Sequence, residues 1–89
     1  MKCIVTVVGK DRIGIIAGVS GLLSSLSINI LDISQTIMGD MFTMIMATDT
    51  AACTESFDTL SAHLSEYGDD NALSIRIQRD DIFNAMHRV

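Results

Sequence analysis

The residues best suited to chemistry lie in one short segment, Lys10 to Ile15. Asp11 is an anion and suits an ammonium group, while the amide N–H groups that open a helix favour a carboxylate. Gly14 lets a ligand come close to the backbone because it has no side chain. An amino acid carries both charges, so this loop is a candidate amino-acid site. The alternative, in which Asp11 only caps the helix and Arg12 is solvated, stays open on chemistry alone.

No other group of residues predicts catalysis. His63 lies at the edge of an apolar helical stripe and His87 in the tail, so both are interpreted as surface or boundary residues. No serine has the Gly-x-Ser-x-Gly context of an activated nucleophile. Gly9 and Gly14 have the spacing of a phosphate loop, but the Lys-Ser/Thr pair that such loops need is missing. We therefore expect no enzyme, no catalytic residue, no cofactor and no metal site.

Composition argues against two classes of partner. Six Lys plus Arg against eleven Asp plus Glu give a net charge of −5, which repels phosphate backbones and anionic membranes. No apolar run approaches about 18 residues, so we expect neither nucleic acid nor a membrane as partner. Cys3 and Cys53 lack CxxC spacing and are interpreted as reduced thiols. The first residues lead directly into a strand pattern without a signal-peptide cleavage site, and we expect a cytoplasmic protein.

Hydrophobic periodicity predicts six elements in the order β-α-β-β-α-β. Strands are expected over residues 3–8, 29–38, 41–48 and 73–78. Asp11 is expected to cap the N-terminus of the first helix and Thr54 that of the second, and Gly68 is expected to end the second helix. This order predicts an α+β, ferredoxin-like two-layer sandwich, in which two helices cover one face of a four-stranded antiparallel sheet. A short C-terminal helix is expected over about residues 80–89. The length suits one domain, 1–89.

Gly39-Asp40 predicts a two-residue type II′ hairpin between the second and third strands. The resulting register pairs Met38 with Met41, Ile37 with Phe42, Gln35 with Met44, and Ile33 with Met46. One face, which we expect to be covered, then carries Leu31, Ile33, Ile37, Phe42, Met44 and Met46. A stripe of small residues on the first helix implies a close approach by the sheet, a partner helix or a ligand: Gly14, Gly18, Gly21 and Ser25.

The strand 29–38 is predicted to be an edge strand, and it has no Lys, no Pro and one charge, Asp32. Such an unprotected edge invites pairing with another strand. Within one chain, Asn29 and the first loop are expected to lie too far apart to hold one small ligand. A two-fold pairing of edges brings Asn29 of one chain toward the loop of the other. We therefore expect a homodimer with shared sites.

The segment Val7 to Val19, with Ser27-Ile28-Asn29-Ile30 and Ser34-Gln35-Thr36, resembles the ACT-domain pattern. More narrowly, the chain is similar to small stand-alone ACT proteins of bacteria, related to the ACT domains of the glycine cleavage system transcriptional repressor. The resemblance implies regulatory, allosteric binding of an amino acid between two ACT domains. The matching ligand positions are Asp11, Arg12, Gly14, Ile15 and Asn29. Serine-sensing relatives have His and Asn where this chain has Gly9 and Asp11, so serine itself is not implied.

Two functions of different class follow from the sequence. The first is a dimeric amino-acid sensor with ligands at the seam between two copies. The second is a ligand-free interaction module that docks on an enzyme or a transcriptional regulator through its sheet edge.

Overall fold

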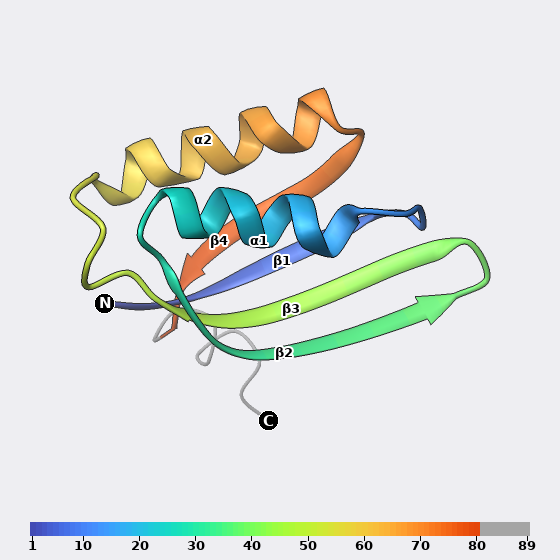
Figure 1. Cartoon of the computed structure of the whole chain (residues 1–89), viewed down its shortest axis with the longest axis horizontal. Coiled ribbons are helices and arrows are strands. Elements are labelled where there is room, and N and C mark those ends of the chain that lie inside the picture. The colour runs from blue at the N-terminus through green and yellow to red at the C-terminus, as the bar shows by residue number, and fades with distance from the viewer. Residues whose placement is uncertain (81–89) are drawn as a thin grey trace.

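The computed structural model describes residues 1–80 of the chain, so the helix expected over about residues 80–89 lies outside the described residues from position 81 on. The elements are β1 (Lys2–Lys10), α1 (Ile15–Ser25), β2 (Asn29–Met38), β3 (Met41–Asp49), α2 (Phe57–Asp70) and β4 (Leu73–Arg79). Both helices lie on one face of an antiparallel sheet with strand order β2-β3-β1-β4 (Figure 1). The ferredoxin-like fold and the edge position of β2 are confirmed.

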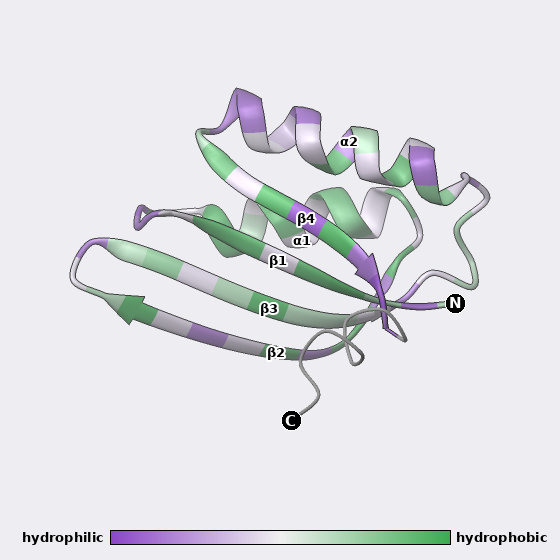
Figure 2. Cartoon of the chain, turned by 180° about the vertical axis from the view of Figure 1, so that it is seen from behind, coloured by the Kyte–Doolittle hydropathy of each residue, from purple (hydrophilic) through white to green (hydrophobic). Residues whose placement is uncertain are grey.

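The core lies between the helices and the sheet, because alternate side chains of β1, β3 and β4 face the helices. The buried side chains of the strands include Cys3, Val5, Val7, Phe42, Met44, Met46, Leu73, Ile75 and Ile77. The helices contribute Ile15, Val19, Leu23, Leu60 and Leu64. The opposite face of the sheet carries no helix within the described chain, and Figure 2 looks onto that face.

The predicted hairpin register between β2 and β3 is confirmed at all four pairs, from Met38 opposite Met41 to Ile33 opposite Met46. Gly39 has φ +63, as the first central residue of a type II′ turn requires. The predicted burial of β2 is wrong, however. Ile33 is 41% and Ile37 54% exposed, because the two helices lie over β1, β3 and β4 and leave the edge strand largely uncovered. Leu31, also exposed, sits at a bulge in the β2–β3 pairing.

Both predicted helix caps are wrong. Helix α1 begins at Ile15 after Gly14, which has φ +91, and no side chain caps it. Asp11 therefore lies too far before the helix to serve as its cap. Helix α2 is capped by Ser56 instead of Thr54, since the Thr59 N–H donates to Ser56 Oγ at 3.2 Å.

The glycines of the two helices have different structural roles. A Cβ at Gly18 would clash with the Tyr67 hydroxyl, so this glycine seats α1 against α2 of the same chain. Gly68 does not end its helix, which continues to Asp70. A Cβ there would lie 2.5 Å from the Leu73 carbonyl oxygen, so Gly68 permits the tight packing of α2 on β4. A Cβ at Gly21 would meet open space.

Candidate functional site

The loop between β1 and α1 lies at the same end of the sheet as the β2–β3 hairpin (Figure 1). The Asp11 N–H donates to the Asp40 carbonyl oxygen at 2.7 Å, which ties the loop to the tip of the hairpin. Lys10 Nζ also lies 4.0 Å from Asp40 Oδ2, but both side chains are highly exposed and such a pair contributes little. The backbone hydrogen bond, more than the ion pair, therefore holds the loop in place.

An open pocket of about 250 Å³ lies between this loop, α1 and the end of β2. Its lining residues are Asp11, Arg12, Gly14, Ile15, Ile16, Ala17, Gln35, Ile37 and Phe42. The structure thus brings together four of the five residues predicted to bind ligand. We refer to this cavity as the loop pocket.

The loop pocket combines charges of both signs with apolar groups. Ile15 and Phe42 are buried, whereas Asp11 and Arg12 are exposed. Neither charged side chain makes a hydrogen bond or ion pair with another residue that the structure describes. A carboxylate and a guanidinium are therefore free to contact a zwitterion while its apolar part lies against the buried residues.

Gln35 also lines the loop pocket, although it is not among the residues predicted to bind a ligand. It lies opposite Met44 on the helix-facing side of β2, between Ile33 and Ile37. The detectable signal is the interruption of an apolar alternation by one polar residue on that face. Its carboxamide can both donate and accept hydrogen bonds, so it adds a third polar group to the pocket.

Asn29 lies at the other end of the sheet. It pairs with Asp49, which in turn pairs with Lys2 at the start of β1. The loop follows Lys10 at the end of the same nine-residue strand, roughly 25–30 Å away at the usual rise per residue. A single chain therefore does not bring Asn29 to the loop pocket.

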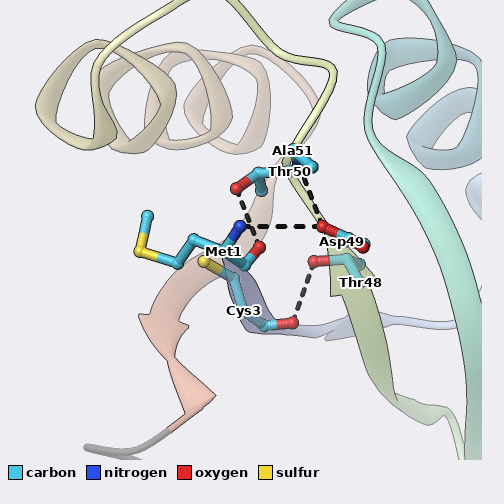
Figure 3. A network of polar contacts seen from close by, with 6 residues as sticks. All are labelled: Met1, Cys3, Thr48, Asp49, Thr50 and Ala51. Atoms are coloured by element: carbon cyan, nitrogen blue, oxygen red, sulfur yellow. Dashed lines mark hydrogen bonds and ion pairs between the residues drawn. The ribbon is translucent and has the colours of Figure 1, made fainter.

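The polar groups at that opposite end are already engaged with one another (Figure 3). Thr48 Oγ1 donates to the Cys3 carbonyl oxygen at 2.8 Å, and Thr50 Oγ1 donates to that of Met1 at 2.9 Å. Asp49 Oδ1 accepts from the Ala51 N–H at 3.0 Å and lies 3.7 Å from the Met1 amino nitrogen. These contacts join β1 to the end of β3, so this cluster is structural.

The cysteines and His63 show no sign of a reactive site. Burial raises the pKa of the Cys3 thiol, which disfavours the nucleophilic thiolate. Cys53 is a free thiol at intermediate exposure. His63 Nε2 on α2 lies 2.9 Å from Oε2 of Glu55, which precedes the helix, and both side chains are partly exposed.

Two larger hollows differ from the loop pocket in character. One, of about 450 Å³, runs along the outer edge of β4 beside Ser61, Ser65 and Asp69 of α2. The other, of about 420 Å³, is lined by Met1, Lys2, Arg79 and Asp80. The first extends along the strand and the second has no apolar wall beyond Met1. Because a small ligand needs polar groups that converge over apolar surface, we take the loop pocket as the candidate site.

Within residues 1–80, no three His, Cys, Asp or Glu side chains gather where they could hold a metal ion. In the same part of the chain, no helix is long and apolar enough to span a bilayer.

The element order and the sheet order together define a ferredoxin-like domain, and the loop pocket lies at one end of its sheet. Residues 2–78 match the model of the ACT domain, and the chain belongs to this family of regulatory modules.

Relatives and solved structures agree with this assignment. A UPF0237 protein of Clostridium acetobutylicum is 56% identical over 89 residues, with both chains covered completely. The structure of an ACT domain protein from Streptococcus pneumoniae matches with a TM-score of 0.84 and 42% identity, over 98% of each chain. A putative glycine cleavage system transcriptional repressor shares the fold, with a TM-score of 0.72 and 24% identity over 86% of this chain and 44% of that one. The chain is thus similar to stand-alone ACT proteins.

Proposed function

We propose that this protein is a cytoplasmic, regulatory amino-acid sensor that acts as a homodimer and performs no chemistry on its ligand. In this proposal the whole chain, residues 1–89, acts as one ACT unit. The observation that carries the proposal is the loop pocket, where free charges of both signs lie beside buried apolar side chains at an uncovered sheet edge.

The chemistry of the loop pocket matches an amino acid. The ammonium group contacts Asp11, and the carboxylate contacts Arg12 and the backbone at the start of α1. The Gly18 N–H donates to the Gly14 carbonyl oxygen, so the preceding N–H groups of Ile15, Ile16 and Ala17 lie before the first helical hydrogen bond. All three residues line the pocket. Unpaired amides there favour a carboxylate.

The uncovered edge at β2 supports self-association. Its unpaired backbone and its exposed Ile33 and Ile37 are features that proteins usually shield. An antiparallel pairing of β2 with β2 of a second copy places the start of one strand beside the end of the other. Asn29 of the partner subunit then lies near Gln35 and Ile37, so each loop pocket gains the fifth predicted residue.

Net charge argues against the other large partners. At −5, the protein repels the phosphates of nucleic acids and the anionic surface of membranes. Its partners in this proposal are a second copy of the chain, an amino acid or related small ligand, and the protein that the sensor regulates.

The proposal is tested by isothermal titration of the purified protein against the twenty amino acids. We expect micromolar to millimolar binding of at least one of them, lost in both Asp11→Ala and Asn29→Ala. Asp69→Ala removes an exposed carboxylate on α2 and serves as the matched control, which should bind as the wild type does. Binding that survives in both loop and strand variants would contradict the assigned residues.

A second function is favoured by the same uncovered edge at β2. A ligand-free module would use Ile33 and Ile37 to dock on an enzyme or a transcriptional regulator. Two results together would support this function and exclude the sensor. None of the twenty amino acids would bind, and one protein partner would bind stoichiometrically to the wild type but not to Ile33→Lys.

A further inference from the structure

The side chains that line the loop pocket divide by polarity. Ile15 and Phe42 are buried there, and Ile16, Ala17 and Ile37 are exposed residues of its apolar wall. The polar lining residues belong to the loop and to Gln35. Any ligand that places its charged groups on Asp11 and Arg12 therefore meets mostly hydrocarbon with the rest of its surface.

Contact with that apolar wall would weaken the binding of a ligand with a polar side chain. Such a side chain would give up hydrogen bonds to water, and none of these apolar side chains could replace them. An apolar side chain gains from leaving water in the same place. We propose, on the basis of the proposed sensor, that the ligand is an amino acid with an apolar side chain, and that Ile37 and Phe42 select it.

Gln35 is assigned to the charged end of the ligand. It lies two residues before Ile37 on the same face of β2, and is therefore farther from the hairpin turn. Because its carboxamide donates and accepts, it can bond to an ammonium or a carboxylate. The volume of about 250 Å³ lies below the range of drug-sized sites, which suits a single amino acid.

The test is a titration of the full-length protein with a homologous series: alanine, 2-aminobutyrate, norvaline and norleucine. Each added methylene that enters the pocket should strengthen binding about fourfold. Serine is the matched control ligand, because it has a hydroxyl where 2-aminobutyrate has a methyl group. We expect serine to bind at least about tenfold more weakly than 2-aminobutyrate.

Protein variants locate the selectivity. Ile37→Ser should flatten the series to less than about twofold per methylene, since it makes the wall polar. Ile45→Ser changes the same residue type on the opposite face of the sheet and should keep the wild-type slope. Light scattering is run on both variants. If Ile37→Ser loses the dimer, Ile37→Val retains an apolar wall and should bind the series with an intermediate slope.

The outcomes separate this inference from the proposed function. A steep series with weak serine binding supports the inference. A flat series, or serine bound as tightly as 2-aminobutyrate, overturns the apolar selectivity while the sensor stands. An unchanged slope in Ile37→Ser removes Ile37 from the selecting wall. Failure of every amino acid to bind overturns the sensor itself, and the inference with it.

Discussion

The two edge strands of the sheet have similar apolar–polar patterns but differ in how far the helices cover them. Both β2 and β4 alternate apolar and polar residues, as the bands of Figure 2 show. In β4, Ile75 and Ile77 are each 7% exposed, because α2 packs tightly over them. In β2, Ile33 and Ile37 remain exposed since no helix reaches fully across that edge. Alternation thus reveals which side chains share a face, but not whether that face is covered.

The difference between the edges is functional in our account. The covered edge at β4 completes the core of one chain. The uncovered edge at β2 adjoins the loop pocket, and in the proposed dimer a second copy covers this edge and supplies Asn29.

The largest effect is expected where α2 meets β4. Gly68→Val places a side chain against the Leu73 carbonyl oxygen, so it should lower the free energy of unfolding by about 3 kcal/mol or more. Urea denaturation followed by circular dichroism measures this. The matched control is Gly21→Ala on α1, which enters open space and should raise stability by about 0.5–1 kcal/mol. A tolerated Gly68→Val would mean that α2 is not packed tightly on β4.

The second prediction concerns the uncovered edge. Ile33→Asp should raise the dissociation constant of the dimer by about 100-fold, because dimerisation would bury an unpaired charge. Circular dichroism should show an intact fold, since Ile33 lies outside the core of the single chain. Analytical ultracentrifugation measures the dimer. Ile45→Asp is the matched control on the opposite face, and an equal loss of dimer there would point to a different interface.

The third prediction tests the corrected cap of α2, the helix that covers β4. Ser56→Ala should cost about 1 kcal/mol of unfolding free energy, because the Thr59 N–H loses its acceptor. Thermal unfolding of the variant measures the loss. Thr54→Ala should change the stability by less than about 0.5 kcal/mol, and the reverse ranking would restore Thr54 as the cap.

The smallest effect is expected from the cysteines. Burial raises the pKa of the Cys3 thiol above its ordinary value of 9.0. The folded state therefore holds this proton more tightly than the unfolded state, and stability falls as pH rises above about 9. A thiol reagent should label Cys53 rapidly and Cys3 only after unfolding. Equal labelling rates in the native protein would contradict the buried position of Cys3.

The sequence predicted much of the fold because the signals are local. The two-residue period and the Gly39-Asp40 turn were enough for the hairpin register. Coverage of β2 was not predictable, since it depends on the position at which α1 packs on the sheet. The caps were also mispredicted. The left-handed conformation of Gly14 places the start of α1 after Asp11, and more than one residue with a hydroxyl group precedes α2, so the pattern alone did not identify the cap.

The candidate site was predictable in part. The loop residues from Asp11 to Ile15 are consecutive, so any fold that orders the loop keeps them together. Gln35 joins them only through the pairing of β2 with β3, and its place in an apolar alternation was the available signal. Its contribution to the pocket depends on where the edge strand lies relative to α1, which the local pattern does not specify.

The central claim is that each site is shared between two copies, and complementation tests it most directly. Asp11→Ala and Asn29→Ala are each expected to abolish binding when purified alone. After the two variants are mixed in equal amounts and allowed to exchange subunits, each mixed dimer has one site with both residues intact. Titration should then recover about a quarter of the wild-type sites. A mixture of exchanged dimers that binds no amino acid would contradict the shared site.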